Sequence, residues 1–160
     1  MATDMFMKLD DIKGESVDDK HKGEIDVLSF KWGAKQPASS HVGGGSGTGK
    51  ADVHDMTFIK AVDKATPLLV HMCLSGKHIN KALLTCRKAG GSPLEHLKFT
   101  MNQVIVSGVN HGGESTGDAV SETVTLSFAS MTMEYVPQKP DGSGDASIVK
   151  GWDIAGNKSL

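Results

Sequence analysis

The stretch TVTLSFASMTMEY, residues 123–135, alternates apolar and polar side chains and changes phase once. The even-numbered positions from 124 to 128 are apolar, and after a one-residue slip the odd-numbered positions from 131 to 135 are apolar. Successive side chains of a strand point to opposite faces, so alternation indicates a strand with one buried face. A slip inside such a strand is typical of a β-bulge, which bends the strand. The stretch therefore predicts a long, strongly bent strand.

The rest of the apolar pattern also has a period of two residues. EIDVLSFKW (24–32) and HLKFTMNQVIV (96–106) each contain one phase slip of the same kind. MFMKL (5–9), KALLTCRKAGG (81–91) and SIVKGWDI (147–154) read as further strands. Bent strands of this kind build small barrels and sandwiches, so the sequence predicts a mainly β fold.

One segment, at about residues 66–75, has the signals of a helix. Thr66 is a suitable N-cap residue, Pro67 suits the first helical position, and Gly76 suits a C-terminal cap. One helical face is apolar, and it carries Leu68, Leu69, Met72 and Cys73. We expect this helix to lie against the β structure and cover apolar surface there.

Three long polar segments separate the predicted elements, at residues 13–23, 35–51 and 107–119. Loops of this length are uncommon unless they are functional or disordered. The chain of 160 residues fits a single domain, residues 1–160, and we expect its tail to be loose from about residue 156.

The bulk properties exclude several classes of partner. The net charge is −2, the pI is about 6.4, and the 17 basic residues are scattered, which argues against binding to nucleic acid or to an anionic membrane. The sequence shows neither a signal peptide nor a stretch of about 20 apolar residues. We therefore expect synthesis in the cytoplasm, without membrane insertion. Cys73 and Cys86 read as small buried hydrophobes, with a single disulfide as the alternative.

Gly44 to Lys50 match the G-x-x-x-x-G-K pattern of a phosphate-binding loop. The match lacks the hydroxyl that would hold magnesium, because Ala51 follows the lysine. The preceding KQPASSH is not a buried strand, and the following DVHDMTFIKAV favours a strand over the required helix. A glycine-rich surface loop explains the stretch better than a nucleotide site.

Residue chemistry gives no catalytic centre. The seven histidines form no HxH, HExxH or close His/Cys pairing, and no GxSxG occurs. The four histidines in or beside the polar loops read as solvated, and His71 reads as a partly buried packing residue. We therefore predict a protein that is not an enzyme, with no catalytic, metal-binding or cofactor-binding residues.

Taken together, many segments resemble the Hcp family, the haemolysin-coregulated proteins of the bacterial type VI secretion system. The resemblance spans the chain in order, through MFMKLDDIKGES, EIDVLSFKWG, the glycine-rich loop, MTFIKAVDKATPLLVHMCLSGKH, LTCRKAGG, TVTLSF, YVPQKPDGS and GWDI. It implies a two-sheet, phage-tail-tube-like β-barrel with one flanking helix. It also implies hexameric rings that stack into the inner tube of a contractile apparatus.

The same resemblance implies partners and an export route. The tube carries a spike protein at its tip, lies within a contractile sheath on a baseplate, and is expelled by contraction, which needs no signal peptide. The lumen can carry secreted effector proteins. Two other functions remain open on the residues alone. One is a monomeric small-ligand β-barrel whose cavity Met101, Met131 and Met133 would line, and the other is a phosphate-loop nucleotide-binding protein.

Two sets of residues are predicted to serve the tube. Polar residues that alternate with the apolar ones are expected to face the lumen: Ser29, Lys31, Lys98, Thr100, Asn102, Thr123, Thr125 and Ser127. A long loop that orders on contact suits ring stacking, so the stacking residues are expected to be His41, Val42, Gly43, Gly44, Gly45, Ser46, Gly47, Thr48, Gly49 and Lys50.

Overall fold

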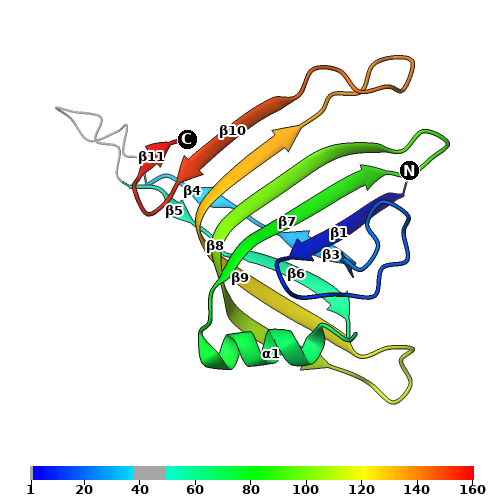
Figure 1. The fold of residues 1–160 in the computed structure, drawn as a ribbon, viewed down its shortest axis with the longest axis vertical. Coiled ribbons are helices and arrows are strands. Elements are labelled where there is room, and N and C mark those ends of the chain that lie inside the picture. The colour runs from blue at the N-terminus through cyan, green and yellow to red at the C-terminus, as the bar shows by residue number, and fades with distance from the viewer. Residues whose placement is uncertain (1, 38–49) are drawn as a thin grey trace.

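The computed structural model describes residues 2–37 and 50–160 (Figure 1). The described chain is mainly β, as predicted, with one helix, α1 (Thr66–Ser75). The strands are β1 (Thr3–Leu9), β2 (Ile25–Asp26), β3 (Ser29–Lys31), β4 (Ala34–Lys35), β5 (Asp52–Val53), β6 (Met56–Ala61), β7 (Ile79–Lys88), β8 (Leu94–Gly112), β9 (Ser121–Tyr135), β10 (Ile148–Asp153) and β11 (Lys158–Ser159).

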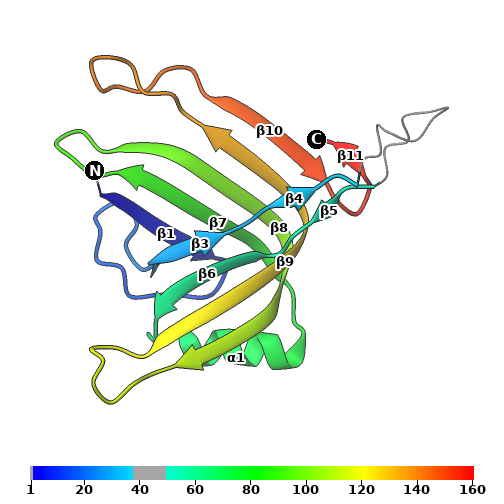
Figure 2. The same ribbon diagram turned by 180° about the vertical axis from the view of Figure 1, so that it is seen from behind.

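Nine strands form one antiparallel sheet, and seven of them follow the order β11-β10-β9-β8-β7-β1-β2, while β3 and β6 lie off this path. Strand β6 pairs with the first half of β9, and β3 pairs with β6, while β4 and β5 form a separate pair. The sheet curls strongly, as Figures 1 and 2 show from opposite sides. It does not close into a complete ring of strands, so the predicted word "barrel" fits it only loosely.

Strands β8 and β9 bend together, at the positions where their apolar patterns change phase. Met101 pairs with Met131 and Val104 pairs with Phe128, and all four side chains are buried. The pairing keeps one register between these two pairs, so the predicted β-bulge is wrong at this place. Gln103 instead takes a left-handed backbone conformation, with φ of 50°. This joint bend turns both strands through a corner and keeps their apolar side chains on one side.

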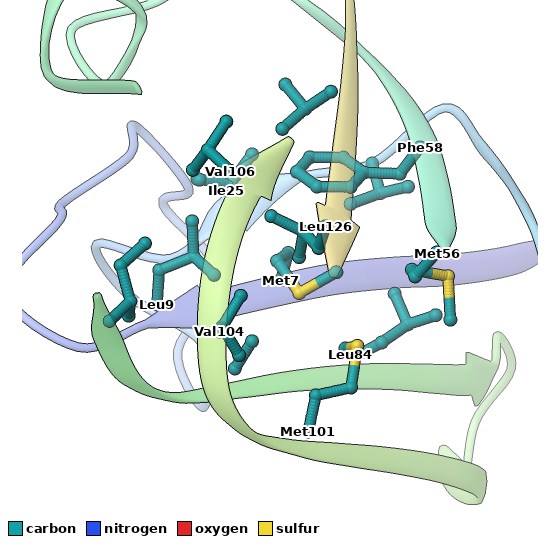
Figure 3. Close-up of a cluster of buried hydrophobic side chains, with 14 of the residues drawn as sticks. Met7, Leu9, Ile25, Met56, Phe58, Leu84, Met101, Val104, Val106 and Leu126 are labelled. Carbon is teal, nitrogen blue, oxygen red and sulfur yellow. The ribbon is translucent and has the colours of Figure 1, made fainter. Parts of the chain in front are cut away.

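The joint bend divides the sheet into two layers around one core. The first, here called the strap layer, contains β10, β9 from 130, β8 up to 102, β7, β1 and β2. The second, here called the open layer, contains β8 from 104, β9 up to 128, β6 and β3. Figure 3 shows the core between them, where Met7, Met101 and Leu84 of the strap layer meet Val106 and Leu126 of the open layer.

The predicted strand 24–32 is two short strands that belong to different layers. Strand β2 pairs with β1, and β3 pairs with β6, so the phase slip marks a change of layer here too. Ile25 and Val27 are buried as expected, whereas Leu28, at the crossing, is 64% exposed. All three slips in the sequence thus mark places where the chain passes from one layer to the other.

Helix α1 covers one end of the core. Gly76 ends it with φ of 65°, as predicted for a C-terminal cap. The predicted N-cap is wrong: Ala65 occupies that position, and the Thr66 hydroxyl accepts a hydrogen bond from the Asp63 backbone N–H at 3.0 Å. Leu69 is fully buried, but Leu68 is 47% exposed, so the apolar stripe is only partly covered. No helix in the described ranges is long and apolar enough to cross a membrane.

Two expectations about loops and tail are corrected. Strand β8 extends to Gly112 and β9 begins at Ser121, so the first half of the expected loop 107–119 is strand. The tail is not loose, because β11 pairs with β10 and the Leu160 backbone N–H donates to the Gly151 carbonyl at 3.2 Å. Both cysteines are free thiols, and burial raises the pKa of Cys86 to about 11.

Candidate functional surfaces

The predicted lumen residues lie on two different faces of the molecule. Those on the open layer are Ser29, Lys31, Thr123, Thr125 and Ser127, and those on the strap layer are Lys98, Thr100 and Asn102. Both layers turn one side toward the common core, so their other sides point in opposite directions. One channel wall cannot contain both groups.

The outer face of the open layer consists mainly of small, uncharged side chains. Lys31, Thr57 and Thr125 form one row across three strands, and the Thr57 and Thr125 hydroxyl oxygens lie 3.4 Å apart. At the edge of this face the Ser107 hydroxyl donates to Asp55 at 2.8 Å. The face is therefore polar and carries few charges.

The outer face of the strap layer is highly charged and partly covered by residues 13–23, here called the strap. Arg87 of β7 donates to both carboxylate oxygens of Asp18 in the strap, at 3.0 and 2.7 Å, and to Asp4 of β1 at 3.1 Å. The hydrogen bond from Arg87 holds the pKa of Asp18 down at about 2. This arrangement pins the strap to the sheet.

His21 is a second anchor of the strap and is buried, not solvated as the sequence suggested. Its Nδ1 lies 2.9 Å from Glu24 Oε2, and its Nε2 lies 2.7 Å from Glu95 Oε1. The imidazole stacks on the Phe6 ring, with centroids 4.3 Å apart. Phe6 itself breaks the alternation of β1, between Met5 and Met7, and this was the sequence signal that the outer face is covered here.

An ionic cluster lies inside the protein where β6, β9 and α1 meet. Lys60 and Glu122 are both fully buried, and Lys60 Nζ lies 2.6 Å from Glu122 Oε2 and 2.8 Å from Asp63 Oδ1. The Thr66 hydroxyl donates to the same Glu122 oxygen at 2.6 Å. His111 Nε2 lies 3.4 Å from Glu122 Oε1, the second carboxylate oxygen.

The cluster keeps its glutamate ionised. Burial acts to raise the pKa of Glu122, but hydrogen bonds from Lys60 and Thr66 outweigh it, and the pKa lies below its ordinary value. This pair was not among the residues predicted from the sequence. The alternation of the strands carried the signal. Lys60 lies two residues after buried Phe58 and four after buried Met56, and Glu122 lies two residues before buried Val124, so both charged residues have the phase of core positions.

Strand β10 extends the core-facing side of the sheet past the edge of the buried core. Register places Trp152 beside Met131 and Ile148 beside Tyr135, on the side that faces inward elsewhere. Exposure rises along each row: Met101 is 0%, Met131 8% and Trp152 37% exposed. Tyr135 and Ile148 are 44% and 58% exposed. These three outer residues, Tyr135, Ile148 and Trp152, form an apolar surface that we call the flange.

The remaining predicted site residues are not brought together by the described structure. Of the predicted stacking residues, 41–49 lie outside the described residues, and Lys50 is exposed beside β5. His71 is exposed on α1, not packed. Within residues 2–37 and 50–160, no group of three or more His, Cys, Asp and Glu side chains is placed to hold a metal ion.

Two β layers around one core, with a partly exposed apolar flange and a weakly charged polar face, define a mainly β protein with two contrasting outer faces. The family model described as "Type VI secretion system effector, Hcp" matches residues 6–135. Protein hcp1 of Pseudomonas aeruginosa is 50% identical over 159 residues, which cover 98% of each chain. The chain therefore belongs to the Hcp family of the type VI secretion system.

Solved structures support the same family assignment. The crystal structure of Hcp1 from Salmonella typhimurium superposes with a TM-score of 0.83 at 43% identity, covering all of both chains. A structure described as a type six secretion system protein reaches a TM-score of 0.95 at 33% identity, covering 99% of this chain and 100% of that chain. The protein is thus a subunit of the type VI secretion tube that associates with itself and is secreted through that system. The comparisons do not favour the small-ligand barrel or the nucleotide-binding protein.

Proposed function

We propose that the chain assembles into hexameric rings, which stack into a hollow tube with the open layer facing the lumen. The flange is the observation that carries the ring. Burying one large apolar side chain stabilises an assembly by about 1.5–3 kcal/mol, so three such residues on one uncovered face favour a protein neighbour. A ring also needs a head-to-tail contact between two different surfaces of one chain, and the flange supplies one of them.

The contrast between the two outer faces supports the orientation. The open layer exposes threonine and serine hydroxyls with few charges, which suits a conduit through which other proteins pass. The strap layer is charged, is uneven because of the strap, and suits the outside of the tube, toward the contractile sheath. In this orientation the outside of the tube carries Lys98, Thr100 and Asn102. Of the predicted lumen residues, only the group on the open layer lines the lumen.

Exchanging Lys31 for glutamate tests the orientation. Lys31→Glu reverses the charge at one of the few charged positions of the open layer, so we expect at least about a tenfold change in the affinity of rings for an effector that co-purifies with them. Lys81→Glu, on the outer face of the strap layer, is the matched control and should bind like the wild type. Calorimetry on purified rings measures both. An effect confined to Lys81→Glu would place the strap layer in the lumen.

Shortening residues 43–49 tests ring stacking. We expect the variant to form hexamers but to lose most of its stacked tubes, because a long loop can bridge neighbouring rings. Gel filtration reports the hexamers, and electron microscopy counts tube lengths. Loss of hexamers along with the tubes would assign the loop to contacts within a ring.

Negative-stain microscopy of the purified wild type tests the proposal as a whole. Rings with six-fold symmetry are the expected result, and a monodisperse monomer would refute it. In the assembled machine the tube would carry the spike at its tip, lie within the sheath on the baseplate, and hold effector proteins in its lumen.

A further inference from the structure

We propose that the strap, residues 13–23, is a pH-sensitive clamp on the outer face of the strap layer, closed by His21 in its doubly protonated form between Glu24 and Glu95. The device does not depend on ring formation, because all of its parts lie within one chain. It controls whether Phe6, on whose ring His21 stacks, stays covered.

The proton count follows from the two contacts. Each ring nitrogen of His21 faces a carboxylate oxygen, at 2.9 Å on one side and 2.7 Å on the other. An ionised carboxylate can only accept a hydrogen bond, and a neutral imidazole can donate from only one nitrogen. Both contacts are hydrogen bonds only when the imidazole carries two protons. Loss of one proton turns one contact into a lone pair facing a negative oxygen.

Several other charged groups lie around His21 and its two carboxylate partners. Beneath the imidazole, β1 supplies the neutral ring of Phe6 and, farther along, Asp4, which Arg87 of β7 binds. Lys98 of β8 lies 3.3 Å from Glu95. Burial acts to raise the pKa of Glu95, but hydrogen bonds from His21 and Lys98 outweigh it, and the pKa is lowered. Histidine is the side chain that ordinarily changes charge between pH 5 and 8, so the proton on His21 decides the state of the clamp.

The clamp has an acid limit as well. Because the pKa of Glu95 is lower in the folded protein than its ordinary value, its stabilising contribution is present above that ordinary value and is lost as the pH falls through the folded pKa. The strap therefore loses its Glu95 contact at low pH, whereas at higher pH the loss of one proton from the imidazole opens it.

Opening is confined to one end of the strap. Arg87 binds Asp18 through two hydrogen bonds, and neither partner changes charge between pH 6 and 8.5. The turn from 19 to 22 has His21 as its side-chain anchor to the sheet, whereas Gly23 is tied to Gly14 and Ser16 by backbone hydrogen bonds. Deprotonation thus frees this turn, uncovers Phe6, and changes the surface that the outside of the subunit presents.

Hydrogen–deuterium exchange of the full chain at pH 6 and pH 8.5, corrected for intrinsic rates, tests the clamp. Loss of one charge-assisted hydrogen bond weakens the closed state, so amides of the turn from 19 to 22 should lose about tenfold or more of their protection at pH 8.5. His21→Gln cannot titrate and should show equal protection at both pH values. His71→Gln, at an exposed position on α1, is the matched control and should behave like the wild type.

Two outcomes would overturn the proposal: wild-type protection of the strap that is the same at both pH values, or an equal loss of protection in His21→Gln. If His21→Gln fails to fold, ¹⁵N spectra of the wild-type imidazole decide. Two protonated ring nitrogens at pH 6 and one at pH 8.5 support the clamp, and one protonated nitrogen at both pH values refutes it.

Discussion

Ile148→Asp is expected to convert the ring-forming protein into folded monomers. Ile148 is 58% exposed on the flange and lies beside Tyr135. A carboxylate there would need to be desolvated against an apolar neighbour, which costs several kcal/mol per contact. Six such contacts would close the proposed hexamer, so the loss is expected to be complete at micromolar concentration. Size-exclusion chromatography with light scattering measures the mass, and circular dichroism verifies the fold.

The neighbouring position gives a matched control for this prediction. Val149 is 50% exposed but pairs with Glu134, on the opposite side of β10. Val149→Asp adds the same charge to the same strand, so we expect it to keep its rings. If both variants dissociate, the strand as a whole is sensitive to charge, and the flange is not the ring contact.

The largest expected effect on stability comes from Lys60→Met. The substitution removes the cation from Glu122 and leaves a fully buried carboxylate. Breaking one side of a buried ion pair typically costs about 3–5 kcal/mol. Urea unfolding at pH 7 measures the loss. Because the pKa of Glu122 then rises, the carboxyl takes up a proton more readily, and the deficit should shrink as the pH falls.

A double variant distinguishes the effect of the charges from the effect of the volume that the two side chains fill. In Lys60→Met/Glu122→Leu both charges are gone, and the free energy of unfolding should return to within about 1–2 kcal/mol of the wild type, or exceed it. Lys8→Met, at an exposed position of β1, should change stability by less than about 0.5 kcal/mol. A double variant as unstable as Lys60→Met would mean that packing, not charge, accounts for the cost.

Much of the fold could be predicted from the alternation of apolar and polar residues. The phase slips in 96–106 and 123–135 predicted bent strands correctly, and the Pro67 and Gly76 signals placed the helix. The mechanism of bending could not be predicted, because a β-bulge and a joint bend of two strands produce the same phase slip in the sequence of one strand. Only the pairing of Met101 with Met131, and of Val104 with Phe128, distinguishes them.

The surfaces were less predictable than the core. Alternation shows that Lys98 and Thr125 both point away from apolar neighbours, but it does not show that their layers face opposite ways. The flange was hidden for a related reason. Ile148 and Trp152 have the same phase as core positions, but they are exposed because the sheet is wider than the layer that covers it. The burial of Lys60 and Glu122 could have been predicted from the phase of their strands, although charged residues are usually exposed.

The joint bend has a mechanical consequence for a subunit of a secretion tube. Strands β8 and β9 pass without interruption from one layer to the other. A pull on either layer is therefore transmitted to the other through covalent backbone as well as through side-chain packing. The two layers cannot slide past each other unless the hydrogen-bonded ladder on either side of Gln103 is broken. Shear resistance is thus built into the subunit before any neighbour binds.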